Sequence, residues 1–310
     1  MPKLGKHQQL NQAKATFTAN AKTFALAAKF LPKERYEAVA RLYAFCRQLD
    51  DLADAAPAGI NHRELVRIRQ EICAGNSQDP NISDMLCLQR DFEIPTTLLL
   101  DFIDTLIEDQ YPRALGNMDE LVQFAYGVAS TVGLMMCHVF GVRDSRALPF
   151  AVDLGLAMQM TNIARDILED AQRNRVYVPA DLPPAPINCE GLVRGDEAQR
   201  ASAYQGALNL LAVADEYYAS AALGYGYLPR TVRQAIKVAA RLYQAIGEKV
   251  AENEATYWER RTVVSSERKC LLITELLLKR MRDGSSTLLI GKFAHREQLH
   301  QALDRRRFSA

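Results

Sequence analysis

The sequence predicts an all-α protein, and three features of its 310 residues support this fold class. Apolar residues recur at helical intervals over most of the chain. Gly and Pro, which interrupt helices, are sparse at 16 and 12 residues. No segment alternates apolar and polar residues, as strands do, over more than a few positions. We therefore expect one large helical domain.

The N-terminal helices are predicted between residues 19 and 55. The first ends in an apolar stripe before Pro32, which can open the next helix at its first turn. The second carries an apolar side from Ala38 to Leu49 and is expected to end near Pro57.

The next helices are predicted at residues 62–74 and 83–110, with a loop at 75–81 between them and a break at Pro95. The helix after Pro95 carries several acids opposite its leucines, which we interpret as an ordinary solvated face. These acids are Asp101, Asp104 and Glu108.

Residues 121–142 include no Asp, Glu, Lys or Arg, and a stretch of this length can span a bilayer. The stretch also contains Gln123, Ser130, His138 and three glycines. A helix that is apolar nearly all round but moderately polar within is typical of the centre of a soluble bundle. We expect a core helix rather than a membrane span.

Helices are predicted again in the C-terminal half, separated by a loop with four prolines at residues 179–188. A Pro-rich loop can mark a domain boundary, but no composition shift follows it. We expect a single domain over residues 1–310, with its core from about 20 to 280 and a mobile basic tail from about 282 to 310. The predicted helices cover residues 148–171, 197–223, 229–260 and 266–281.

Charge and composition exclude several function classes. A net charge of +1 gives no support for a nucleic-acid partner. The six cysteines and five histidines are scattered, which argues against a zinc site and fits reduced thiols in the cytoplasm. The N-terminus has no apolar run behind its charges, so we expect no signal peptide.

Residues 159–170 form the most informative stretch. Gln159, Asn162, Asp166 and Asp170 follow each other at steps of three, four and four, so on one helix they would share a face. Carboxylates four residues apart repel each other unless a positive charge lies between them. The pattern therefore indicates a hard divalent cation.

A second DxxxD pattern, Asp50 and Asp54, lies one turn after Arg47. If the two helices face each other, four carboxylates converge in a partly desolvated space, which is unfavourable unless cations fill it. Mg²⁺ prefers oxygen ligands and is often held by a few carboxylates together with substrate phosphates. Arg47 and Arg165 can donate to phosphate oxygens.

This constellation suits ionisation of an allylic diphosphate, in which metal and arginine stabilise the leaving group. The carbocation then requires a long, dry pocket. No P-loop, GxGxxG, GxSxG or HExxH motif offers another chemistry. Candidate pocket residues are Phe24, Tyr43, Phe124, Tyr126, Val132, Leu134, Met135, Leu156, Met160 and Tyr243.

The two motifs together resemble those of the squalene/phytoene synthases, the head-to-head trans-isoprenyl diphosphate synthases. Residues 43–54 (YAFCRQLDDLAD) match the first aspartate-rich motif of that family. Residues 159–170 (QMTNIARDILED), followed by 174–179 (NRVYVP), match the second. Residues 128–133 are similar to the small-residue segment of its central helix. The likeness extends from about residue 20 to 280.

The resemblance implies a class I isoprenoid-synthase-like helical bundle with a central cavity. It implies Mg²⁺, or alternatively Mn²⁺, bound by Asp50, Asp54, Asn162 and Asp166, with Asp170 closing the second motif. Catalysis would rest on Asp50, Asp54, Asp166, Asp170, Tyr43 and Arg47. The diphosphates or prenyl chains would contact Thr23, Tyr43, Arg47, Gln159, Arg165, Tyr243 and Tyr126.

The implied reaction condenses two geranylgeranyl diphosphates to phytoene through prephytoene diphosphate, without NADPH. The likeness is greatest to bacterial phytoene synthases, and we expect none of the hydrophobic C-terminal anchor of eukaryotic squalene synthases. Two alternatives remain: a C30 synthase that makes presqualene diphosphate, dehydrosqualene or squalene from two farnesyl diphosphates, and a non-catalytic assembly factor. Phe124 in place of a common tyrosine, and Ser130 in place of a common glycine, depart from the family pattern.

The amphiphilic substrate and apolar product lead us to expect a cytoplasmic protein that associates peripherally with the inner face of the membrane. The basic residues Arg305, Arg306 and Arg307, followed by Phe308, could dock on anionic lipid. The resemblance also suggests contact with a downstream desaturase or an upstream prenyl diphosphate synthase. No nucleic-acid partner is expected.

Overall fold

The computed structural model describes residues 6–55, 59–282 and 293–304. Contacts between Cα atoms divide the chain into two compact units, and each unit is assembled from three separate segments. The first unit comprises Met1–Tyr111, Thr131–Arg143 and Leu228–Ala235, and the second comprises Pro112–Ser130, Asp144–Tyr227 and Ile236–Ala310. The single domain predicted from the sequence therefore stays a prediction.

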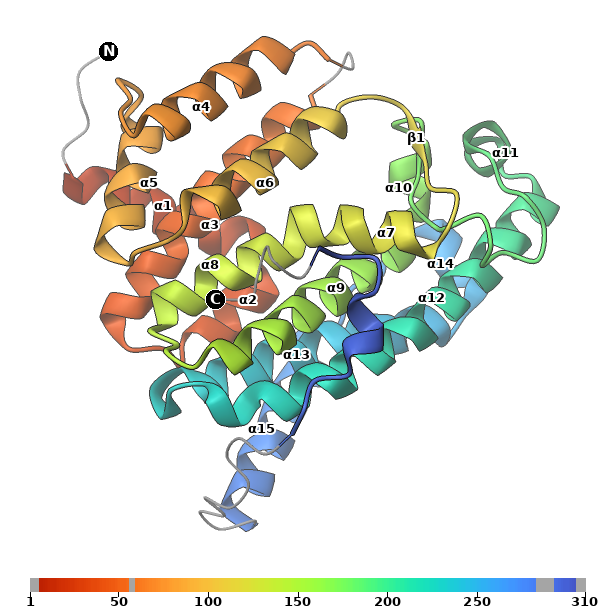
Figure 1. Cartoon of the computed structure of the whole chain (residues 1–310). Coiled ribbons are helices and arrows are strands. Elements are labelled where there is room, and N and C mark those ends of the chain that lie inside the picture. Colours follow the sequence, from red (N-terminus) through yellow and green to blue (C-terminus); the bar gives the residue numbers. More distant parts are fainter. Residues whose placement is uncertain (1–5, 56–58, 283–292, 305–310) are drawn as a thin grey trace. The chain divides into compact units, whose positions relative to one another are not determined.

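The first unit is a group of helices packed around α3 (Figure 1). Helix α3 buries Leu42, Phe45 and Leu49 against its neighbours, as its apolar periodicity predicts. The unit's other helices pack on α3 or on one another. The helices are α1 (Lys6–Asn20), α2 (Lys22–Ala28), α3 (Lys33–Ala53), α4 (His62–Ala74), α5 (Pro80–Asp91), α6 (Thr96–Glu108) and α8 (Thr131–Phe140).

Local signals set most of these boundaries. Asp79 caps α5 by accepting hydrogen bonds from the backbone N–H groups of Asn81 and Ile82, and Pro80 occupies the first turn. Gly75 ends α4 with a positive φ of 70°. The predicted loop and the break at Pro95 are confirmed. Helix α1 was not predicted, because its apolar residues do not gather on one face.

The second unit is built on α9, which packs along α12 and against the π-helical turn η1 (Figure 1). A third long helix, α13, begins in the first unit and continues into this one. The longer helices are α7 (Met118–Ala125), η1 (Tyr126–Ser130), α9 (Leu148–Arg165), α12 (Glu197–Leu223), α13 (Arg230–Ala251) and α15 (Ser266–Arg282). The short elements are β1 (Arg113–Ala114), η2 (Ser145–Ala147), α10 (Ile167–Ala171), β2 (Arg175–Val176), α11 (Cys189–Arg194), η3 (Gly224–Tyr227), α14 (Glu254–Glu259) and η4 (Glu297–His300).

The π-helical turn η1 lies in close contact with α9. A Cβ atom added to Gly155 of α9 would stand 2.6 Å from Ser130 Cα, so only glycine fits at this position. The buried Ser130 Oγ donates a hydrogen bond of 2.9 Å to the carbonyl oxygen of Val152. Serine at position 130 is therefore accommodated by its own hydrogen bond to α9.

The apolar helical run Met118–Phe140 is long enough to cross a membrane, and 61% of its most apolar window is buried inside the protein. Such burial fits the core helix that the sequence predicts. The run differs from the prediction in one respect, because the π-helical turn at Tyr126–Ser130 interrupts its regular α geometry.

Two further details depart from the sequence-based predictions. A two-residue parallel pair, β1 with β2, accompanies the helices. The helix predicted over 229–260 is two helices, because the Asn253 side chain caps α14. Of the predicted mobile tail, residues 293–304 are described, and His300 among them is buried; the mobility of the tail stays a prediction. The basic residues Arg305, Arg306 and Arg307, with Phe308, lie outside the described residues.

Candidate active site

The first aspartate-rich motif lies along α3 in the first unit. Tyr43, Arg47 and Asp50 follow one another at helical spacing, and Asp54 ends the helix, with its backbone N–H bonded to the Asp50 carbonyl oxygen at 2.8 Å. Thr23 is half-buried on α2 of the same unit. Tyr43, Arg47, Asp50 and Asp54 therefore lie on one helix or at its end, and their roles in the site stay predictions.

Asp50 carries the most perturbed carboxylate of the first motif. Burial raises its pKa to about 7, and the charges of Asp54, Asp51 and Asp109 push in the same direction against Arg47. Asp109 is itself buried and follows the end of α6. The sequence analysis missed this residue; the signal was a carboxylate directly after a helix whose other side is strongly apolar.

Part of the Arg47 guanidinium group forms an ion pair with the exposed Asp51. Its Nη2 atom lies 2.5 Å from Asp51 Oδ1, whereas its Nε is buried and has no hydrogen-bond partner among the described residues. Tyr43, one turn earlier, packs on Phe17 with ring centroids 5.2 Å apart. Burial raises the pKa of the Tyr43 phenol, so the phenol stays protonated and can donate.

The second motif lies in the second unit, where α9 ends at Arg165 and α10 begins at Ile167. Asp166 stands between them with φ −108° and ψ 19°, outside the helical region. The continuous helix predicted over residues 148–171 is therefore wrong at this point. Gln159 and Asn162 lie on α9, while Asp170 lies on the separate helix α10.

Two arginines clamp the carboxylate of Asp166. Arg165 Nε donates to Asp166 Oδ1 at 2.6 Å, and its Nη2 also contacts Oδ2. Arg261 donates from Nε and Nη2 to the two oxygens at 2.9 and 2.7 Å. Burial alone would raise the Asp166 pKa, but these hydrogen bonds outweigh it and lower the pKa below its ordinary value.

Arg261 was not among the predicted site residues, because it lies 95 positions from Asp166 in a loop after α14. Helix α14 is held to α9 by Tyr257, whose hydroxyl donates to the Ala164 carbonyl oxygen at 2.8 Å. Burial and the charges of Asp166, Glu169 and Asp170 raise the pKa of Tyr257. The contact positions the segment that carries Arg261 beside the motif.

Asn162 presents an unsatisfied oxygen. Its Oδ1 atom is buried and has no hydrogen-bond partner among the described residues, while its Nδ2 donates to Gln159 Oε1 at 3.4 Å. A buried carbonyl oxygen without a donor is unfavourable unless a ligand completes it. The predicted role of Asn162 as a metal ligand agrees with this feature.

Several aromatic candidates for the pocket also lie in this unit. Tyr126 is buried in η1, and Tyr243 on α13 is close enough to Arg261 and to buried Tyr218 to affect their pKa values. Phe124 stacks on Tyr177, with ring centroids 4.7 Å apart and planes at 10°. Position 124 therefore carries no phenol of its own, but its phenylalanine ring lies directly against the ring of Tyr177.

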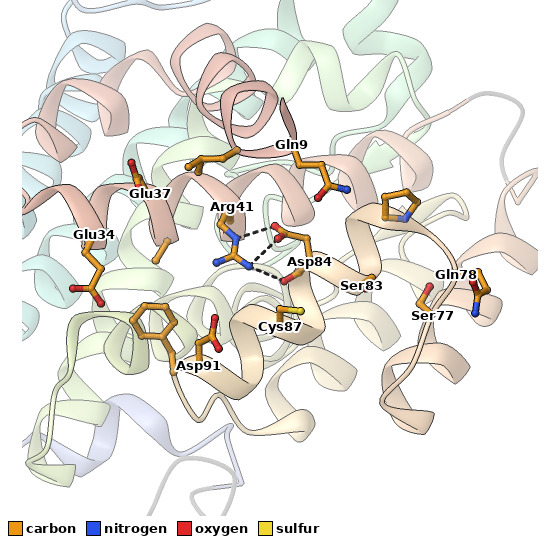
Figure 2. Close-up of a pocket in the computed structure, with 14 residues that line it drawn as sticks. Gln9, Glu34, Glu37, Arg41, Ser77, Gln78, Ser83, Asp84, Cys87 and Asp91 are labelled. Carbon is orange, nitrogen blue, oxygen red and sulfur yellow. Dashed lines mark hydrogen bonds and ion pairs between the residues drawn. The ribbon is translucent and has the colours of Figure 1, made fainter. Parts of the chain in front are cut away.

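A pocket of about 640 Å³ opens in the first unit, and Figure 2 shows the residues that line it. Arg41 stands at its centre and binds Asp84 through Nε and Nη2 at 2.9 and 2.8 Å. Arg41 lies nine residues before Asp50, about 180° around α3. Because none of the motif side chains line this pocket, we assign the chemistry to the motifs and not to the pocket.

A sequence model described as squalene/phytoene synthase matches residues 17–268. The chain belongs to the squalene/phytoene synthase family. It is 34% identical to a 15-cis-phytoene synthase of Paracoccus sp. over 268 residues, covering 83% of this chain and 86% of that protein. It is 31% identical to a 15-cis-phytoene synthase of Pantoea ananas over 291 residues, covering 88% and 94%.

The fold is similar to that of a crystallised dehydrosqualene synthase, with a TM-score of 0.74 over 90% of this chain and 98% of that chain. At 24% identity this likeness concerns the fold alone. The predicted all-α isoprenoid-synthase fold and family membership are thus confirmed. The chain is a prenyltransferase whose relatives support head-to-head prenyl condensation.

Proposed function

We propose that this protein is a phytoene synthase that condenses two geranylgeranyl diphosphates through prephytoene diphosphate. The observation that carries the proposal is the pair of aspartate motifs, in which the Asp50 carboxylate is crowded by other carboxylates and Asn162 Oδ1 has no hydrogen-bond partner among the described residues. The names of the bacterial relatives support the choice of product.

The residues present fit a divalent cation with a preference for oxygen. Asp50 has a pKa raised to about 7 by burial and three neighbouring carboxylates, which a cation would relieve. Asn162 Oδ1 is buried without a partner among the described residues. Carboxylate and amide oxygens without thiolates or imidazoles favour Mg²⁺, with Mn²⁺ as the alternative.

In this proposal, Asp50, Asp54, Asn162 and Asp166 hold Mg²⁺, with Asp170 closing the second motif. The metal, when bound, neutralises charge on the diphosphate as it leaves. Arg165 and Arg261 already form hydrogen bonds with carboxylate oxygens, and their planar donor sets suit phosphate oxygens equally well. The buried Nε of Arg47 offers a further donor to a diphosphate.

The remaining predicted contacts complete the substrate site. Thr23, Tyr43 and Gln159 can donate hydrogen bonds to phosphate oxygens. Tyr126 and Tyr243 offer aromatic faces that stabilise a carbocation. No reductant enters the proposed reaction, so NADPH is not expected to change the product.

Incubation of the purified protein with geranylgeranyl or farnesyl diphosphate, each with and without NADPH, tests the proposal. We expect phytoene from the C20 substrate in the presence of Mg²⁺ and no turnover after chelation. Turnover of farnesyl diphosphate alone would instead identify a C30 synthase. Failure to release diphosphate from either substrate would leave a non-catalytic role.

The proposal includes peripheral attachment to the inner face of the membrane, since the product is apolar. Flotation of the full chain with anionic and neutral liposomes tests this, with Arg305→Gln/Arg306→Gln/Arg307→Gln as the matched variant. Equal flotation of both proteins would remove the basic tail from the explanation. Contact with a desaturase or a prenyl diphosphate synthase is a further expectation that co-purification tests.

A further inference from the structure

Two histidines near the C-terminus and one aspartate of α9 form a buried cluster in the second unit. His295 Nε2 lies 2.9 Å from Asp153 Oδ2, and His300 Nε2 lies 2.7 Å from Asp153 Oδ1. The two rings lie with centroids 4.2 Å apart. Asp153 is fully buried, and the side chains of His300 and His295 are 1% and 11% exposed.

This cluster is separate from the second aspartate motif. Asp153 lies nine residues before Asn162 on the same helix, which places it about 180° around α9 and about 13 Å along its axis. The cluster could not be predicted from the sequence, because 142 and 147 positions separate Asp153 from the two histidines. The scattered histidines therefore did not exclude a metal site.

The cluster buries one carboxylate between two imidazoles. With neutral imidazoles, a fully buried carboxylate would keep a net negative charge, which is costly in a protein interior. One ligand atom from each residue lies within 4.8 Å of the other two. Two imidazole nitrogens and one carboxylate oxygen form a donor set used for Zn²⁺, and a divalent cation would neutralise the buried charge.

We propose that Asp153, His295 and His300 bind a transition-metal ion of the Zn²⁺ class. Imidazole ligands disfavour Mg²⁺, so this ion would differ from the one expected at the aspartate motifs. Ligand atoms around tetrahedral Zn²⁺ are about 3.3 Å apart when metal–ligand bonds are about 2.0 Å. The two short N–O separations would open by about half an ångström, which small side-chain rotations allow.

The ion ties residues 293–304 to the body of the second unit. Two neutral hydrogen bonds assist it: Tyr217 Oη donates to the Leu299 carbonyl oxygen at 2.9 Å, and Gln123 Nε2 donates to the Ala302 carbonyl oxygen at 3.3 Å. The Phe150 ring packs edge-on against His295, with centroids 5.3 Å apart. The metal would be the strongest attachment in this set, because it joins charged and imidazole ligands in a buried place.

The test uses the full chain, treated with a chelator, dialysed and titrated with Zn²⁺ or Co²⁺ in the absence of substrate. We expect one equivalent of Zn²⁺ and, with Co²⁺, the strong visible absorption of a site with four or five ligands. The double variant His295→Gln/His300→Gln should bind Zn²⁺ at least about tenfold more weakly. His62→Gln, which removes a histidine of the first unit, is the matched control and should bind as the parent does.

Equal Zn²⁺ affinity of the parent and the double variant would overturn the proposal and leave the cluster as a hydrogen-bonded network. Glutamine keeps a polar group at both positions, which favours folding of the variant. If the variant still does not fold, X-ray absorption of the Zn²⁺-loaded parent decides. Imidazole scattering in its spectrum supports the site, and a spectrum of oxygen ligands alone overturns it.

Discussion

The two aspartate motifs share the same spacing but hold their carboxylates in opposite electrostatic states. In the first unit, burial and three neighbouring carboxylates raise the pKa of Asp50 to about 7. In the second unit, Arg165 and Arg261 bind both oxygens of Asp166 and lower its pKa. At the first motif Arg47 does not offset burial and the neighbouring carboxylates, whereas at the second motif two arginines outweigh burial.

This difference suggests that two motifs with the same DxxxD spacing can bind metal or diphosphate in different ways. At the first motif a bound cation would offset the repulsion between Asp50 and its neighbouring carboxylates. The free energy of metal binding would then include the relief of this repulsion. At the second motif a metal or diphosphate competes with ion pairs that already exist, so guanidinium groups must exchange partners. Each of the four predictions that follow would sharpen or break this contrast.

The largest expected effect is on turnover. Asp50→Asn and Asp166→Asn should each lower kcat/KM by about 10³-fold, because each removes a charged ligand that stabilises the leaving diphosphate. The measurement is diphosphate release at saturating Mg²⁺, with circular dichroism as a check on folding. Near-normal activity of either variant would refute its metal assignment.

Asp166→Asn should also destabilise the metal-free protein, by about 2 kcal/mol, since it leaves two guanidinium groups without their carboxylate. Because the folded-state pKa of Asp166 is lowered, its stabilisation is complete above the unfolded value of about 3.9 and is lost as the pH falls through the folded value. Denaturant unfolding at pH 7.5 and pH 3.5 measures this. A variant as stable as the parent at pH 7.5 would contradict the clamp.

Asp50→Asn should change the free energy of unfolding in the opposite direction to Asp166→Asn. It should stabilise the metal-free protein at pH 8 by about 1–2 kcal/mol. Its pKa is raised, so the parent pays an increasing ionisation penalty as the pH rises from about 4, the unfolded value, to about 7. The two proteins should therefore have equal stability near pH 4. Thermal unfolding in the presence of a chelator tests this, and a variant less stable than the parent at pH 8 would remove the contrast between the motifs.

The smallest effect is expected at Arg261, whose side chain is 55% exposed. Arg261→Gln should raise KM for the diphosphate substrate and lower kcat/KM by about tenfold, because one charge-assisted donor pair is lost. The neighbouring exposed Arg260→Gln is the matched control and should keep the parent's kinetics. Equal effects of the two variants would indicate a general charge effect and no specific clamp.

Much of the fold was predictable because helices are encoded locally. Residues 197–223 were predicted as one helix and form α12 with those bounds. The misses occurred where the regular helical backbone is interrupted: the cap of Asn253, the break at Asp166, and the π-helical turn beside Gly155. Hydrophobic periodicity does not report such interruptions.

The sequence by itself determined the helical class, the two aspartate motifs and the family, since each depends on residues that are close together in the chain. The tertiary structure decided which charges meet. Asp109 beside Asp50, Arg261 on Asp166, and the histidines on Asp153 all come from distant segments. A pKa depends on burial and on charges within a few ångströms, and both are set only when the chain has folded.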